Sequence, residues 1–64
     1  MKLTKREREV IELVSVGKKT KLIAAKLGIS VHTVRDHIKN AMHRNGWHTR
    51  VQAAVGLRSH DYQG

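Results

Sequence analysis

The fold of this chain is decided by residues 20–38, Thr20-Lys-Leu-Ile-Ala-Ala-Lys-Leu-Gly-Ile-Ser-Val-His-Thr-Val-Arg-Asp-His-Ile38. In the first half of the stretch, apolar residues recur at helical spacing, at Ile23, Ala24 and Leu27. Gly28 can adopt a left-handed turn conformation without steric cost, and the hydroxyl of Ser30 can cap a second helix. Two short amphipathic helices joined by a tight turn predict a helix-turn-helix motif at about residues 20–45.

The second helix of the motif is expected to carry apolar residues on one face and polar residues on the other. Val34 and Ile38 form the apolar face. With Ile23 and Leu27, they are expected to form the core between the two helices. The outward positions are polar: His32, Thr33, Arg35, Asp36 and Lys39. A helix that presents such side chains can enter the major groove, so the motif predicts binding to double-stranded DNA.

A further helix is predicted before the motif. Thr4 and Glu7 form a capping-box pattern at the start of a helix that runs from about Lys5 to Val16. Gly17 ends this helix. Its buried stripe is expected at Val10, Leu13 and Val14, with Ile11 at the edge.

The remaining helix boundaries follow from capping and stop residues. Thr20 is expected to cap the first helix of the motif, and the pair Asn45-Gly46 is a stop signal for the second. Thr49 can cap a fourth helix at about residues 50–58. Residues 59–64 beyond that helix are expected to fray.

Size and charge place limits on the class of protein. The chain has 64 residues and no Cys, so we expect a single all-α domain of four helices that spans residues 1–64 around a small core. It carries 13 Lys and Arg against 5 Asp and Glu, a net charge of +8. Three of the acids lie in the first helix, and Asp36 is the only acid between residues 13 and 60. A basic body with one acidic helix predicts a polyanionic partner on one face.

Several classes of protein are excluded by what the sequence lacks. No apolar run is long enough to span a membrane, and no helix joins a basic face to a large aromatic face, so we expect no membrane contact and a cytoplasmic, nucleoid-associated location. His32 and His37 are five residues apart and share no helical face, which argues against a metal site. The sequence offers no activated nucleophile and no paired carboxylates, so we expect neither an enzyme nor a cofactor.

A motif pattern along most of the chain resembles the LuxR/GerE-type DNA-binding domain. The resemblance rests on Leu3-Thr-Lys-Arg-Glu-Arg-Glu-Val10, on Ile29-Ser30 and on Thr33-Val34-Arg35 with His37, and it covers about residues 3–55. It implies a four-helix fold, DNA binding as a dimer and regulation of transcription.

Four residues of the second motif helix are predicted to read DNA bases: Arg35, Asp36, Lys39 and His32. Arg35 can donate two hydrogen bonds to the O6 and N7 atoms of guanine, and Lys39 can reach guanine or phosphate. The role of Asp36 stays open. Its carboxylate can accept from a cytosine amino group, it can restrain Arg35 or Lys39, or it is a solvated surface group. The resemblance implies base-reading positions for Arg35, Asp36 and Lys39.

A second group of residues is predicted to contact phosphates. Ser30 and Thr33 lie near the start of the second motif helix, where hydroxyls and free backbone N–H groups suit phosphate. Lys19, Thr20 and Lys21 open the first motif helix and are expected to flank the groove. Such contacts position a protein on DNA and supply salt-dependent affinity.

The fourth helix is predicted to hold a homodimer together. Its expected contact residues are Val51, Ala54, Val55 and Leu57. Small residues on this helix can permit close approach across a two-fold axis. Gly56 loosens the helix, so self-association in solution is expected to be weak.

Three residues depart from the family pattern. Leu22 replaces a residue that is usually acidic, Asn45 stands where an apolar residue usually ends the helix, and Trp47 replaces a small aliphatic residue. Leu22 can add exposed apolar surface. A first alternative function therefore stays open, a protein-interaction module that binds and modulates another regulator through Leu22 and Trp47. The high net positive charge leaves a second alternative open, sequence-independent coating of DNA.

Overall fold

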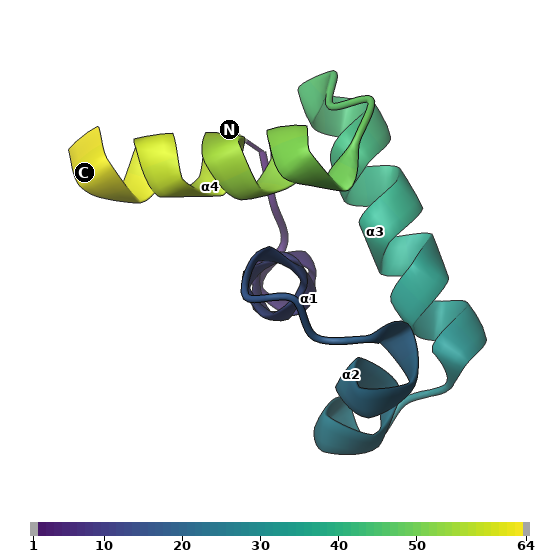
Figure 1. The fold of residues 1–64 in the computed structure, drawn as a ribbon. Coiled ribbons are helices and arrows are strands. Elements are labelled where there is room, and N and C mark those ends of the chain that lie inside the picture. Colours follow the sequence, from purple (N-terminus) through teal and green to yellow (C-terminus); the bar gives the residue numbers. More distant parts are fainter. Residues whose placement is uncertain (1, 64) are drawn as a thin grey trace.

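The computed structural model describes residues 2–63, and the side chains of residues 2–58. It contains four helices, α1 (Lys5–Ser15), α2 (Thr20–Leu27), α3 (Val31–Asn45) and α4 (Arg50–Gln63). Figure 1 shows α1 almost along its axis, with α2, α3 and α4 arranged around it. The predicted all-α class and the order of the four helices are confirmed.

The ends of α1 follow from local hydrogen bonds. The Glu7 backbone N–H donates to Thr4 Oγ1 at 3.1 Å, and the Thr4 backbone N–H donates to Glu7 Oε1 at 3.0 Å, so the predicted capping box is formed. The helix ends at Ser15, one residue earlier than predicted. Val16 is the C-cap, because Gly17 takes a φ of 81° and turns the chain.

The turn between α2 and α3 has the predicted construction. Gly28 has a left-handed φ of 69°, and the backbone N–H of Ile29 donates to Ala24 O at 3.0 Å. Ser30 caps α3, since its Oγ accepts from the backbone N–H of Thr33 at 3.0 Å. The α2 helix starts at Thr20 as predicted, but the expected capping role of Thr20 is wrong, because Lys19 is the extended N-cap residue and Thr20 is already helical.

The core lies where α1 meets the other three helices. Val10, Ile23, Val34 and Ala53 are fully buried there, together with Ile11, which was predicted at the edge of the stripe. Ile11 is covered because α1 packs against helices on several sides. Ile38 is buried as predicted, whereas Leu27, at the end of α2, is only half-buried against the core.

The fourth helix begins as predicted and ends later. The backbone N–H of Gln52 donates to Thr49 Oγ1 at 3.1 Å, and Gln52 Oε1 accepts from the backbone N–H groups of Thr49 and His48. The helix continues to Gln63, so the frayed tail predicted from residue 59 is wrong for the backbone described. No Pro and no left-handed Gly interrupts it before that point. Residue 64 lies outside the described residues.

Two long-range polar contacts join the start of the chain to the end of α3. Asn45 Oδ1 accepts from the Lys2 backbone N–H at 2.7 Å, and Asn45 Nδ2 donates to Lys2 O at 2.8 Å. Arg44 donates through both terminal nitrogens to the two carboxylate oxygens of Glu7, the second at 3.1 Å. Glu7 is only 3% exposed, so this ion pair balances a buried charge.

Acid is expected to destabilise the domain through Glu7. The hydrogen bond from Arg44 lowers the pKa of the Glu7 carboxyl below its ordinary value near 4.5, against the opposing effect of burial. A lowered pKa in the folded state stabilises the fold at pH values above the unfolded pKa. That stabilisation is lost as the pH falls through the lower, folded-state pKa. Urea unfolding measured between neutral and acid pH should show a steeper loss for the wild type than for Glu7→Gln.

The matched control for this measurement is Glu9→Gln on the same helix. Glu9 pairs with Arg6 at 2.9 Å, but both side chains are exposed. Exposed ion pairs contribute little to stability. The Glu9→Gln variant should therefore follow the wild-type acid profile, and a Glu7→Gln profile equal to that of the wild type would contradict the assigned role of Glu7.

Candidate nucleic-acid interface

One face of α3 carries the four residues that were predicted to read bases. They follow one another at helical spacing of i, i+3, i+4 and i+7, and all are exposed: His32, Arg35, Asp36 and Lys39. We call these four residues the α3 polar row. The opposite face of α3 is buried in the core through Val34, Ile38 and Ala41. The core thus fixes which side of α3 is presented to a partner.

Asp36 has a different partner from those predicted. Its Oδ2 lies 3.3 Å from His32 Nε2, one turn earlier on the helix, so it restrains neither Arg35 nor Lys39. Within the described part of the chain, no carboxylate forms an ion pair with Arg35 or Lys39. Both cations are therefore available to an anionic partner, while the carboxylate of Asp36 is held beside an imidazole.

The start of α3 places two hydroxyls beside the polar row. Ser30 Oγ donates to Thr33 Oγ1 at 2.9 Å in addition to its capping bond. Ser30 is exposed and Thr33 is half-buried. The two hydroxyls lie at the end of the helix where backbone N–H groups favour anions.

The starts of α2 and α4 lie close together and are basic. Lys19 and Lys21 are exposed on either side of Thr20. Arg50, the first residue of α4, places Nη2 3.5 Å from Thr20 Oγ1. Arg50 was not among the predicted site residues, because nothing in the local pattern shows that a residue thirty positions later returns to the start of α2. Its position directly after the Thr49 cap was the only available hint.

Positive charge is distributed unevenly over the helices. On α1, Arg6 pairs with Glu9 and Arg8 pairs with Glu12, the latter at 3.1 Å. The cations at the starts of α2 and α4 and on the α3 polar row form no such pairs in the described part of the chain. Two of the three cations of α1 are thus compensated, whereas those of the helix-turn-helix motif are left to attract a polyanion.

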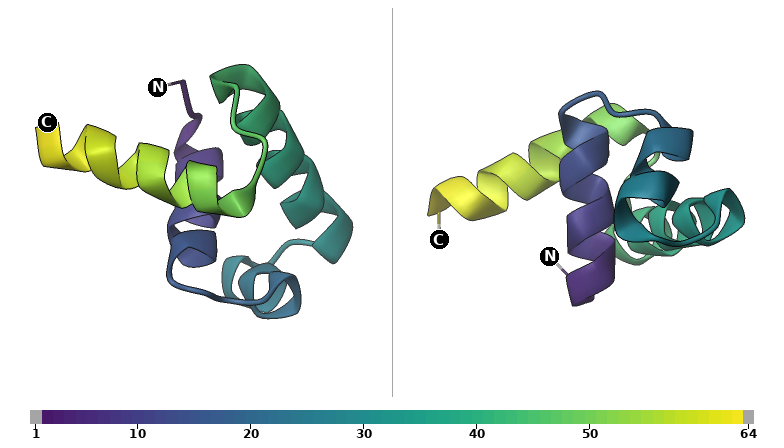
Figure 2. Two further views of the ribbon diagram at one scale, coloured as in Figure 1. Left: turned by 45° about the horizontal axis from the view of Figure 1, so that its top comes forward. Right: turned by 90° about the horizontal axis from the view of Figure 1, so that it is seen from below.

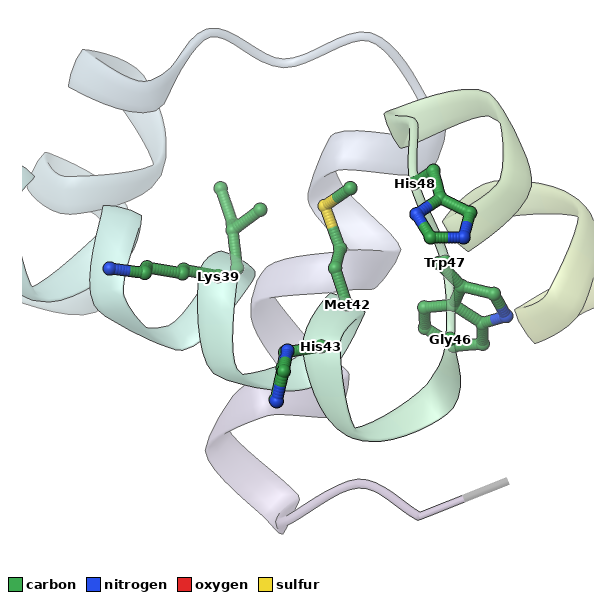
Figure 3. A pocket seen from close by; sticks show the side chains of 7 residues that line it. Lys39, Met42, His43, Gly46, Trp47 and His48 are labelled. Atoms are coloured by element: carbon green, nitrogen blue, oxygen red, sulfur yellow. The ribbon is translucent and has the colours of Figure 1, made fainter.

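Beside the polar row, the second half of α3 borders an open groove of about 470 Å³. Figure 3 shows Met42 and Trp47 along it and His43 and His48 at its edges. Lys39 lines the groove and also belongs to the α3 polar row. Among residues 2–58, no cluster of side chains could hold a metal ion.

The predicted dimer residues separate into two groups. Val51 and Val55 lie one turn apart on α4 and are 71% and 53% exposed. Leu57 is only 4% exposed and belongs to the protein's own core, and Ala54 is also buried. Figure 2 shows in both views that the C-terminal half of α4 extends beyond α1, away from α2 and α3. An intermolecular contact on α4 would therefore use the valines.

The departures from the family pattern have distinct places in the structure. Leu22 is 49% exposed on α2, which confirms the predicted apolar surface. Trp47 is half-buried and packs against the core.

None of the helices within residues 2–63 has both the length and the apolar character needed to cross a membrane.

Two helices joined by a tight turn, with exposed and unpaired cations on the second, define a helix-turn-helix DNA-binding domain. The family model described as "Bacterial regulatory proteins, luxR family" matches residues 1–57. The chain belongs to this family. It is a DNA-binding domain of the type that regulates transcription, and not an enzyme.

Individual relatives agree with this assignment. The spore germination protein GerE of Bacillus subtilis is 58% identical over 55 residues, which cover 86% of this chain and 74% of GerE. The nitrate/nitrite response regulator protein NarL of Escherichia coli is 40% identical over 53 residues, and the transcriptional regulatory protein LiaR of Bacillus subtilis is 43% identical over 53 residues. The chain spans only 24% and 25% of these two longer proteins. The 58% identity confirms the likeness of the chain to GerE within the family.

Proposed function

We propose that the chain is a sequence-specific transcription regulator that binds double-stranded DNA as a homodimer, with α3 in the major groove. The observation that carries this proposal is the α3 polar row, which is exposed along one face while the other face is buried. A helix so presented can lie in the groove without exposing its apolar side chains. Binding to chromosomal DNA would associate the protein with the nucleoid.

All four residues of the polar row are proposed to face the bases, with His32 also in contact with Asp36. Arg35, which forms no ion pair within the described chain, donates to the O6 and N7 atoms of guanine. Lys39, one turn later, donates to guanine or to a phosphate oxygen. Asp36 accepts from a cytosine amino group, and His32 holds the carboxylate in place from one turn earlier.

Phosphate contacts are proposed at the starts of α2, α3 and α4. The proposed residues are Lys19, Thr20, Lys21, Ser30 and Thr33, to which the structure adds Arg50. Arg50 joins the group because it lies beside Thr20 and has no carboxylate partner in the described chain. Side chains at helix starts commonly fix the register of a protein on the duplex.

Replacing Lys21 with Ala is expected to weaken binding to all duplexes to a similar degree. The slope of log affinity against log salt should fall by roughly one unit, because one fewer counterion is released on binding. Fluorescence anisotropy titrations at several salt concentrations, with a selected and a random duplex, measure both effects. Lys5→Ala, an exposed charge removal on α1, is the control and should leave the slope unchanged. A loss confined to one DNA sequence would show that Lys21 reads bases instead.

The homodimer is proposed to form through α4. Val51 and Val55 give this helix an exposed apolar strip, with the small Ala54 beside it. One helix-turn-helix places few side chains on base edges, and two copies on a pseudo-palindrome multiply the affinity.

A charge at Val55 is expected to separate dimeric from monomeric binding. Val55→Glu should lose about tenfold or more in affinity for a duplex with two half-sites, since the two-fold contact buries the carboxylate. Binding to a single half-site should change little. Val55→Thr, which keeps the shape without a charge, is the control. Sedimentation that finds one wild-type chain per palindrome would contradict the dimer and favour the protein-interaction module, for which Leu22 supplies the exposed surface.

A further inference from the structure

Few contacts join α3 and α4 directly, although both helices pack on α1. In the described part of the chain, α4 packs mainly on α1, while α3 packs on α1 and α2. The two helices are joined by residues 46–49. If α4 holds the dimer and α3 reads the half-site, the angle between them decides how far apart the two α3 helices lie on DNA.

Trp47 is anchored to the end of α3 by its backbone. Its N–H donates to Met42 O at 2.8 Å, and the N–H of Gly46 donates to His43 O at 3.3 Å. Gly46 takes a left-handed φ of 68°, which completes a helix end of the Schellman type. Figure 3 shows the indole beside the end of α3, with its nitrogen directed toward the α4 ribbon.

The indole of Trp47 rests directly on the backbone of α4 at Gly56. A Cβ added at Gly56 would lie 2.6 Å from Cζ2 of the ring and 2.7 Å from Cε2 and Nε1. Gly56 is helical and has no positive φ, so a left-handed turn does not explain the glycine. The close approach of the Trp47 ring explains why position 56 is a glycine. Glycine is the least favourable residue in a helix after proline, yet α4 has one at position 56, and the Trp47 ring occupies the space that a Cβ would fill.

We propose that the contact between Trp47 and Gly56 is a positioning device that sets the angle between α4 and the recognition helix, and hence the half-site spacing that a dimer accepts. The inference rests on the proposed homodimer. Trp47 is fixed to α3 through its backbone and to α4 through its ring, so it links the reading element to the dimer element. A methyl group at Gly56 would force ring and helix apart by about 1 Å to reach ordinary contact distance.

The experiment compares Gly56→Ala with the wild type on duplexes of different geometry. Wild-type protein first selects its half-site from a random DNA library, and sedimentation gives the number of chains on a two-half-site duplex. Affinities are then measured for a single half-site and for paired half-sites moved closer or further apart by one or two base pairs. Gly56→Ala should bind the single half-site like the wild type, and lose about tenfold or more at the spacing that the wild type prefers.

A second variant and an optical readout keep the test decisive. Trp47→Phe retains Gly56 but leaves a gap beneath the smaller ring, so it should accept a wider range of spacings. Trp47 is the only Trp in the chain, so its fluorescence reports directly whether Gly56→Ala displaces the ring. If Gly56→Ala does not fold by circular dichroism, the spacing profile of Trp47→Phe decides.

The outcomes separate the inference from the proposed function. Folded variants with a wild-type spacing profile would overturn the inference and leave the homodimer intact. An equal loss on the single half-site would also overturn it, because the contact would then act on the recognition helix itself. One wild-type chain per two-half-site duplex would overturn the homodimer and the inference together.

Discussion

Truncation of Ile23 to Ala is expected to lower the free energy of unfolding by about 2–5 kcal/mol. Ile23 is fully buried on α2 within the core cluster. Removal of its side chain leaves a cavity that neighbouring helices can fill only in part. Small domains have total stabilities near the low end of about 5–15 kcal/mol, so the variant should be partly unfolded at room temperature. Urea unfolding followed by circular dichroism measures the loss.

Leu27→Ala on the same helix is the matched control for Ile23→Ala. The two substitutions remove side chains of equal size, but Leu27 is only half-buried. Its truncation should cost clearly less, because part of the side chain is already in water. A loss for Leu27→Ala that equals or exceeds the loss for Ile23→Ala would contradict the packing of α2 described above.

Replacement of Arg35 by Ala is expected to weaken binding to the selected DNA site by about 1–3 kcal/mol, which is roughly 5-fold to 150-fold in affinity. Arg35 lies in the α3 polar row without an ion-pair partner in the described chain, so the loss comes from the contact with DNA rather than from the fold. The preference at one base pair should relax. Selection from a random library with wild-type and variant protein measures the change in preference.

Arg35→Lys separates geometry from charge at this position. Lysine keeps the charge but cannot donate two parallel hydrogen bonds from a planar group. The Arg35→Lys variant should therefore bind random DNA like the wild type. It should not recover the wild-type preference at the base pair that Arg35 reads. An unchanged preference in Arg35→Ala, with full affinity, would show that the α3 polar row is not the reading face.

The helix boundaries could be predicted from sequence because their causes are local. The capping box of Thr4 and Glu7, the turn at Gly28 and the cap at Ser30 each involve residues within four positions of one another. The capping residue of α2 was misassigned by one position, because Thr20 is a good capping residue by type, yet Lys19 is the extended N-cap and Thr20 is helical. Residue preference alone does not decide between two adjacent positions.

The long-range parts of the structure could not be predicted in the same way. Glu7 and Arg44 are 37 residues apart, and Thr20 and Arg50 are 30 residues apart. Their pairing depends on how the helices pack, which no local pattern records. The burial of Ile11 has the same origin, since three helices surround α1.

Within the α3 polar row, one contact was available from sequence and was still missed. His32 and Asp36 are four residues apart on a helix, which is the spacing of a local ion pair. The partners predicted for Asp36 within the chain were Arg35 and Lys39. The exposure of Arg35 and Lys39, by contrast, followed directly from the apolar period of Val34 and Ile38.

The contacts of the first residues impose an order on biosynthesis. Within this domain, Lys2 and Glu7 are made before their partners, Asn45 and Arg44, which follow 43 and 37 residues later in the chain. The apolar face of α1 likewise packs on α4, which follows the other three helices in the described chain. A nascent chain that ends before α3 is complete holds an amphipathic helix with neither its ionic nor its apolar partners. The contacts that bury α1 are therefore complete only once both α3 and α4 have been made, which favours folding of the domain as one cooperative unit over folding helix by helix.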